Sequence, residues 1–192
     1  MIPQEDLTTA LSAVVEAFDK LHIQHCIGGS VASSFHGAAR GTMDVDLLCE
    51  LTSERMSDFL ACFNEDYYVS ESAVRDAIER QSCFNLIHLP TSFKIDVFVS
   101  EGRPFDSIRL ERAKRERIGT SPAITVSMSS AEDVVVSKLE WFRKGHETSE
   151  RQWDDVSRLM RLIAATADVA YLREAAESIN VADLLQRLLD QT

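Results

Sequence analysis

The start of the chain alternates between apolar and polar positions with the spacing of an α-helix. Apolar residues follow one another at intervals of three or four, at Leu7, Leu11, Val14, Phe18 and Leu21. This spacing puts them on one side of a helix, as a stripe that faces a core. We therefore predict a helix over residues 4–21.

Shorter apolar runs, rich in β-branched residues and separated by turn residues, follow this helix. Such runs predict strands, here over residues 23–27, 43–49, 67–69, 83–89, 92–99 and 123–128. Pro90-Thr91 joins two of these runs as a hairpin. Between the strands, helical patterns predict helices over residues 31–37, 52–63, 71–80 and 105–117.

The last third of the chain has only the helical pattern. Ser129-Ser130-Ala131-Glu132 has the form of a capping box, which opens a helix that runs to about Lys144 and stops at Gly145. Three further helices are predicted over residues 150–165, 168–178 and 181–190. Three aromatic residues are assigned to the core between these helices: Trp141, Phe142 and Trp153.

These patterns together predict an α+β fold. Residues 1–128 form a mixed sheet flanked by helices, which is expected to be the catalytic core, and residues 129–192 form a helical subdomain packed on it.

Three aspartates lie within the predicted strands, where a carboxylate is costly unless something neutralises it. Asp44 and Asp46 are two residues apart, so both lie on one face of a strand, roughly 6–7 Å apart at the backbone. Asp96 belongs to a later strand and shares its face with Lys94 and Phe98. Taken singly, each aspartate also fits a strand with one solvated face. As a set, they indicate Mg²⁺ and phosphoryl or nucleotidyl transfer, with Asp96 as a general base.

A glycine turn precedes the first two aspartates. Gly28-Gly29-Ser30 follows a predicted strand, and Ser30 is expected to cap the helix that begins there. Backbone N–H groups, a hydroxyl and a helix N-terminus at such a turn suit a triphosphate.

The composition and charge of the chain limit the kinds of molecule that it is expected to bind. The chain has 192 residues and a net charge of −11, which repels nucleic acid and favours a cationic small molecule or a basic protein. Residues 109–117 are locally basic and are assigned to a solvated helix face. No run of about 18 apolar residues and no signal peptide is present, so we expect a cytoplasmic protein without membrane contact. The cysteines and histidines lack the spacing of a zinc site.

A resemblance adds to this interpretation. Gly28-Gly29-Ser30-Val31-Ala32, followed by Arg40-Gly41-Thr42-Met43-Asp44-Val45-Asp46, resembles the first motif of the DNA polymerase β-like nucleotidyltransferase superfamily, in its abortive-infection toxin-like branch. Lys94-Ile95-Asp96-Val97-Phe98 is similar to the strand that carries the third carboxylate. The segments 130–143 and 150–156 resemble the two helices that follow in that branch.

The resemblance implies a role for each matching residue. Asp44, Asp46 and Asp96 would be catalytic and would bind Mg²⁺ or Mn²⁺. The nucleotide would be bound by Gly28, Gly29, Ser30, Arg40, Thr42 and Lys138. Asp155 would support the site, although it equally fits an ordinary pairing with a neighbouring arginine. The resemblance also implies a toxin role and an antitoxin protein as partner.

Three hypotheses remain open from the sequence. The first is a metal-dependent enzyme that moves a nucleoside monophosphate from an NTP to a hydroxyl of a cationic small molecule, a protein or a tRNA. The second is a catalytically inactive module of the same fold that binds a nucleotide or a partner protein. The third is a structural acidic domain.

Overall fold

The computed structural model describes residues 4–38, 41 and 44–191. Its strands form one seven-stranded mixed sheet in the order β3-β4-β5-β2-β1-β7-β6. The strand bounds are β1 His25–Ile27, β2 Asp44–Cys49, β3 Tyr67–Val69, β4 Cys83–His88, β5 Phe93–Val99, β6 Lys114–Ile118 and β7 Ile124–Met128. The pairs β2–β5 and β1–β7 are parallel, and the other pairs are antiparallel.

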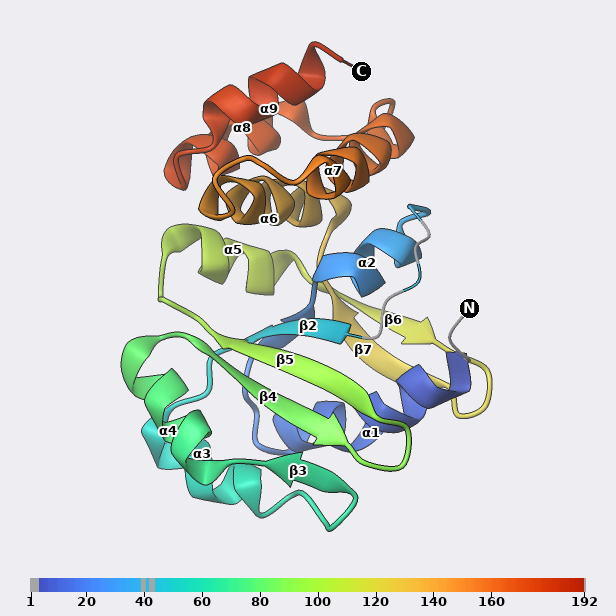
Figure 1. Cartoon of the computed structure of the whole chain (residues 1–192), viewed down its shortest axis with the longest axis vertical. Coiled ribbons are helices and arrows are strands. Elements are labelled where there is room, and N and C mark those ends of the chain that lie inside the picture. Colours follow the sequence, from blue (N-terminus) through green and yellow to red (C-terminus); the bar gives the residue numbers. More distant parts are fainter. Residues whose placement is uncertain (1–3, 39–40, 42–43, 192) are drawn as a thin grey trace.

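Helices cover both faces of the sheet (Figure 1). On one face lie α1 Gln4–Lys20, α3 Ser53–Leu60 and α4 Glu71–Arg80. On the other lie α2 Gly29–Phe35 and α5 Pro104–Arg112, and beyond them the helices that follow β7. Those helices are α6 Ala131–Lys144, α7 Glu150–Ile163, α8 Val169–Ser178 and α9 Ala182–Leu189. The predicted mixed α/β class is therefore confirmed.

The alternation along β5 shows how the sequence directs the sheet. Phe93, Ile95, Val97 and Val99 are buried on the side of α1 and α4, and the residues between them are only half-buried on the opposite side. The apolar stripe of α1 packs against this buried side, where Phe18 contacts Phe59 of α3 with ring centroids 4.9 Å apart. The polar side of β5 is therefore left to face α5 and α6.

One predicted helix is wrong in its second half. Residues 105–117 were expected to be helical, but α5 ends at Arg112 and Lys114–Ile118 is the edge strand β6, paired with β7. Ala113, with an extended backbone, separates the two elements. The segment contains so many charged residues that it has no apolar periodicity from which a helix or a strand could be told. Charged side chains on an edge strand also discourage its pairing with another chain.

The helices after β7 share a hydrophobic core that continues into the sheet layers. Ser130 caps α6 by accepting from the Asp133 amide at 3.1 Å, so the expected cap is present one residue later than the predicted box begins. The buried Asp133 also accepts a hydrogen bond from the Tyr171 hydroxyl of α8 and lies 3.4 Å from Arg112 Nε of α5. These bonds connect α5, α6 and α8. The division of the chain near residue 128 stays a prediction.

Among the described residues, no helix is both long enough and apolar enough to cross a membrane.

The core of α6 yields a stability prediction. Leu139 is fully buried, so Leu139→Ala should lower the free energy of unfolding by roughly 2–5 kcal/mol, the usual cost of a cavity of this size. Leu162→Ala is the matched control, because Leu162 of α7 is exposed and its truncation should change stability by at most about 0.5 kcal/mol. Urea denaturation measures both, and equal losses would contradict the assigned packing.

Candidate active site

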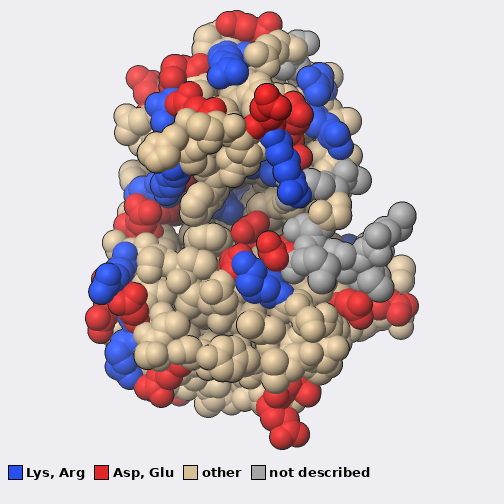
Figure 2. Space-filling model, in the orientation of Figure 1, with Lys and Arg blue, Asp and Glu red and all other residues tan. Residues whose placement is uncertain are grey.

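A cavity of about 630 Å³ lies between the polar side of the sheet and the helices α5, α6 and α7. Its sheet side includes Gly29, Ser30, Asp46 and Phe98, and its helix side includes Arg109, Lys138, Glu140, Trp141 and Asp155. In Figure 2 the surface is hollowed between the sheet and the upper helices, with acidic and basic side chains around the hollow. The cavity therefore brings together most of the predicted site residues that the structure describes.

The parallel pairing of β2 with β5 places the predicted carboxylates side by side. Asp46 is directly opposite Asp96 in the register, and Asp44 is opposite Lys94. Adjacent strands are about 4.8 Å apart, so the two facing carboxylates repel each other. Burial raises the pKa of Asp46, and the neighbouring Asp96 raises it further, whereas Lys138 lowers it.

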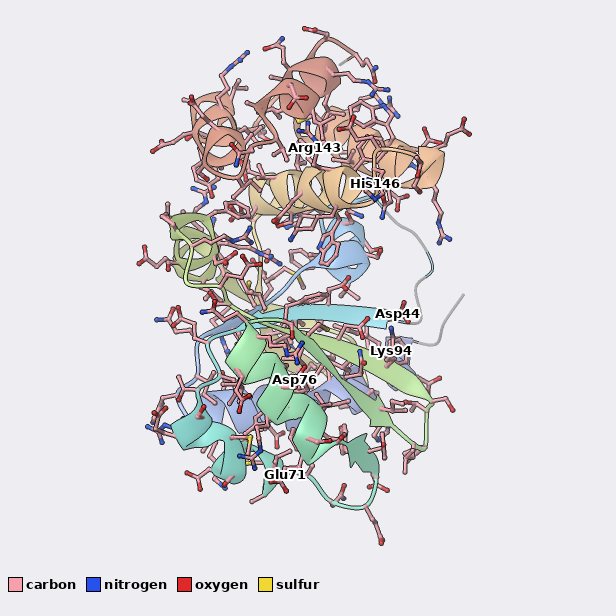
Figure 3. All side chains as sticks on the ribbon, turned by 60° about the vertical axis from the view of Figure 1, so that its left-hand side comes forward. Asp44, Glu71, Asp76, Lys94, Arg143 and His146 are labelled. Atoms are coloured by element: carbon pink, nitrogen blue, oxygen red, sulfur yellow. The ribbon has the colours of Figure 1, made fainter. Side chains whose placement is uncertain are left out.

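Lys94 balances part of this negative charge. Its Nζ lies 2.8 Å from Asp96 Oδ2, and the Asn85 side-chain amide donates to the other carboxylate oxygen of Asp96. The hydrogen bond to Asp96, followed by the charges of Asp96, Asp44 and Asp46, raises the pKa of Lys94. Figure 3 shows Lys94 and Asp44 at the same end of the neighbouring strands β5 and β2.

The predicted metal ligands, all within the described part of the chain, are not gathered into a cluster of three. Among the residues that the structure describes, no three carboxylate, imidazole or thiol side chains are grouped closely enough to hold a metal ion. Mg²⁺ does not require such a cage, because it is usually bound by one or two carboxylates together with waters and substrate phosphates. The carboxylates of Asp46 and Asp96, at directly opposite positions of β2 and β5, are the kind of oxygen ligand that suits Mg²⁺ or Mn²⁺.

The glycine turn is fixed against β2. The Gly28 amide donates to the Asp46 carbonyl at 2.9 Å, and Gly29 has a φ of +55°, in the left-handed region that favours glycine. A Cβ on Gly29 would overlap the Asp46 carboxylate. Gly28 is the N-cap of α2 and Ser30 lies within the first turn, so the expected capping by Ser30 is wrong. Ser30 lines the cavity instead.

Arg109 is a cavity residue that the sequence did not indicate. Its Nε donates to Ser129 Oγ at 3.2 Å, and Ser129 Oγ in turn donates to Cys26 Sγ at 3.2 Å. A Cβ on Gly28 would overlap the guanidinium of Arg109, so glycine at this position permits the approach. The charge of Arg109 also lowers the pKa of Asp46. The sequence placed Arg109 on a solvated helix face, and only the packing of α5 shows otherwise.

Lys138 and Asp155 face each other across the helices α6 and α7. Lys138 Nζ lies 3.8 Å from Asp155 Oδ2, and the two side chains are 16% and 18% exposed. Both line the cavity, and the charge of Lys138 reaches Asp46. Lys138 is therefore a cation of the cavity wall rather than an ordinary surface lysine. Arg40 and Thr42, the other predicted nucleotide-binding residues, lie outside the described residues.

The aromatic residues of the helical region divide into two groups. Phe142 is buried, with its ring centroid 5.2 Å from that of Trp153, as the core assignment predicted. Trp141 is 46% exposed and lines the cavity, so its assignment to the core is wrong.

Comparison with known proteins gives the class of fold. No family model matches the chain, and no curated protein sequence matches it significantly. Among solved structures, it is similar to an antigenic nucleotidyltransferase-like protein from Paracoccidioides brasiliensis, with a TM-score of 0.59, 18% identity, and coverage of 98% of this chain and 91% of that one.

It is also similar to ANT(2″)-Ia in complex with adenylyl-2″-tobramycin, with a TM-score of 0.53, 14% identity, and coverage of 90% of this chain and 97% of that one. A solution structure of the antibiotic-resistance factor ANT(2″)-Ia gives a TM-score of 0.50 at 14% identity, over 94% of this chain and 96% of that one. The chain therefore has a nucleotidyltransferase-like fold. None of these structures supports the more specific toxin-like branch.

The raised pKa of Asp46 predicts how stability depends on pH. In the folded protein Asp46 ionises at a higher pH than in the unfolded chain, so the folded state binds more protons between the two pKa values. The stability contributed by Asp46 therefore falls as pH rises through that interval and stays lost at neutral pH. Asp46→Asn should raise the melting temperature at pH 7 and flatten its pH dependence.

Thermal unfolding at several pH values, without metal or nucleotide, measures this effect. Asp76→Asn is the control, because Asp76 lies on α4 in an exposed ion pair with Arg80. Mg²⁺ should raise the melting temperature of the wild type more than that of Asp46→Asn. A wild type and an Asp46→Asn variant with the same pH profile would contradict the proposed burial of charge.

The turn geometry predicts that Gly29 tolerates no side chain. Gly29→Ala combines a left-handed backbone with overlap on Asp46, so it should destabilise the protein by about 1–3 kcal/mol and displace the carboxylate. Gly145→Ala is the control, because Gly145 has a φ of −82° and a Cβ there would make only near-normal contacts. Chemical denaturation compares the two, and Gly29→Ala as stable as Gly145→Ala would refute this geometry.

Proposed function

We propose that the protein is a metal-dependent nucleotidyltransferase that moves a nucleoside monophosphate from an NTP to an acceptor hydroxyl. The observation that carries the proposal is the position of Asp46, which lines the cavity with Gly29 against its carboxylate and with Lys138 and Arg109 on the facing wall. Asp96 does not line the cavity itself but lies directly opposite Asp46 on the neighbouring strand. The nucleotidyltransferase-like fold supports the same class of reaction.

The negative groups have distinct proposed tasks. Asp44, Asp46 and Asp96 would hold Mg²⁺ or Mn²⁺, which would supply charge neutralisation for the triphosphate and the leaving pyrophosphate. Asp96 also takes the proton of the acceptor hydroxyl, while Lys94 and Asn85 fix the orientation of its carboxylate. The hydroxyl oxygen forms a bond to the α-phosphorus, and the bond from that phosphorus to the bridging oxygen of the β-phosphate breaks. The electron pair leaves with pyrophosphate.

The positive groups bind the phosphates in this proposal. Lys138 approaches them as a point charge from α6, with Asp155 behind it at 3.8 Å. Arg109 lies against Gly28, held by Ser129, and presents a planar fork that suits phosphate oxygens. Gly29 and Ser30 line the same cavity, and Gly28 lies beside them against Arg109. Arg40 and Thr42 complete the predicted nucleotide-binding set by resemblance.

The acceptor is proposed from charge. With a net charge of −11, the protein favours a cationic small molecule over tRNA, and one protein of similar fold was solved with adenylyl-2″-tobramycin. A protein side chain and a tRNA end remain the alternative acceptors. The toxin role, the antitoxin partner and the cytoplasmic location rest on sequence alone and stay predictions.

One observation favours the second function, a catalytically inactive module that binds a nucleotide or a partner protein. The ammonium of Lys94 already forms an ion pair with Asp96 and interacts with Asp44 and Asp46. This internal cation reduces the negative charge that would attract a metal ion.

Label transfer separates the two functions. Each α-labelled NTP is incubated with Mg²⁺ and candidate acceptors, and the wild type is compared with Asp44→Asn/Asp46→Asn. We expect the double variant to lose transfer on the order of 100-fold or more, because several kcal/mol of charge stabilisation in the transition state is removed. Transfer that survives the double change would rule out the carboxylate mechanism.

The matched control is Glu71→Gln/Asp76→Asn, which removes two carboxylates from α4 and should retain activity. Both residues form exposed ion pairs within that helix, and Figure 3 shows them on α4, away from Asp44 and Lys94. A wild type that binds NTP with Mg²⁺ but transfers no label to any acceptor would favour the inactive module.

A further inference from the structure

Trp141 is exposed where a large aromatic side chain is normally buried. It belongs to α6 and is 46% exposed, while its helix neighbours Leu139 and Phe142 are buried. Tryptophan gains more from burial than almost any other side chain, so an exposed indole on a cavity wall leaves part of its apolar face uncovered, beside the Lys144 ammonium that lies over the ring. The cavity side of that face is available to a ligand.

A second aromatic ring from the opposite wall supports Trp141. Phe98 of β5 lies with its ring centroid 5.5 Å from that of Trp141, at an interplanar angle of 58°. Both residues line the cavity. The tilt leaves the two rings in contact at an angle, so Phe98 limits how far the indole can turn without covering it.

The two walls of the cavity have the same order of groups. On β5, Phe98 follows Asp96 by two residues on the same face, roughly 6.5 Å along the strand. On α6, Trp141 follows Lys138 by one helical turn, roughly 5–6 Å. The strand and the helix thus each carry a charged group suited to phosphate or metal and, one step further, an aromatic ring that lines the cavity. Lys138 lines the cavity as well, whereas Asp96 lies beside it, opposite Asp46.

Polar groups surround the aromatic pair. Lys144 Nζ lies 5.1 Å from the Trp141 ring centroid and 2.9 Å from Glu140 Oε1, and Arg103 Nη1 donates to Glu140 at 2.6 Å. A flat ligand with an apolar face and polar edges fits such surroundings. A nucleobase has this character and is joined through ribose to the phosphates at the other end of the cavity.

We propose that Trp141, supported by Phe98, is the stacking platform for the base of the NTP. The proposal rests on the proposed function and adds the position of the base to it. Stacking on an indole accepts any base, since every base has a π-face, so discrimination among NTPs by this platform is weak. An acceptor molecule on the same indole is the competing occupant.

The chain offers a direct optical test, because it contains only two tryptophans. Trp153 packs on Phe142, carries Arg187 at 4.2 Å over its ring and donates from Nε1 to Gln191. It does not line the cavity. The variant Trp153→Phe therefore leaves Trp141 as the only tryptophan, and its emission under selective tryptophan excitation is followed while ATP, GTP, CTP, UTP or tripolyphosphate is added with Mg²⁺.

We expect every NTP to quench Trp141, and tripolyphosphate to bind by calorimetry without quenching. In the wild-type background, Trp141→Ala should weaken ATP binding about 5- to 100-fold, as expected for the loss of one stacked base, and should leave tripolyphosphate binding unchanged. Trp141→Phe should restore most of the affinity, and Trp153→Phe is the matched control with normal binding.

Different failures have different meanings. If ATP binds by calorimetry while Trp141 emission is unchanged and Trp141→Ala binds it normally, the stacking proposal fails and the proposed function stands. Equal quenching by tripolyphosphate and ATP, or quenching by a cationic acceptor alone, also overturns the platform. Binding of neither ATP nor tripolyphosphate overturns the stacking proposal together with the proposed function.

Discussion

The site depends on one constraint, the parallel pairing of β2 with β5 that sets Asp46 directly opposite Asp96. Burial raises the pKa of Asp46, and the repulsion between two carboxylates on adjacent strands raises it further. Three cations balance this negative charge. Lys94, on the same strand as Asp96, forms an ion pair with it, and Lys138 of α6 and Arg109 of α5 lower the pKa of Asp46.

The helices above the sheet form the wall of the cavity that faces these carboxylates. The bonds of Asp133 to Tyr171 and its ion pair with Arg112 connect α5, α6 and α8, so the wall that carries Lys138, Arg109 and Trp141 is made of helices joined to one another. The cavity of about 630 Å³ between this wall and the sheet has room for more than a metal ion and its waters. This arrangement underlies both the proposed transfer and the proposed base platform.

Local sequence patterns predicted most of the helices and strands. The helical spacing of α1, the hairpin of β4 and β5, and the capped α6 followed directly from periodicity and turn residues. Prediction failed at residues 114–118, because a run of mostly charged residues has no apolar period, and the pairing with β7 decided that it is a strand. Ser30 was wrongly expected to cap α2, because the helix starts two residues earlier, at the left-handed Gly29, and Gly28 is its N-cap.

The sequence by itself determined the chemistry that is available: two aspartates at strand spacing, a third in a later strand, a glycine turn, and a lysine on a later helix. It determined them because residue type and local spacing fix which groups share a face. Only the tertiary structure decided which groups meet. The strand register put Asp96 beside Asp46, the packing of α5 brought Arg109 to Gly28, and the packing of α6 against β5 left Trp141 exposed in the cavity. These contacts join residues far apart in the chain, and no local pattern encodes them.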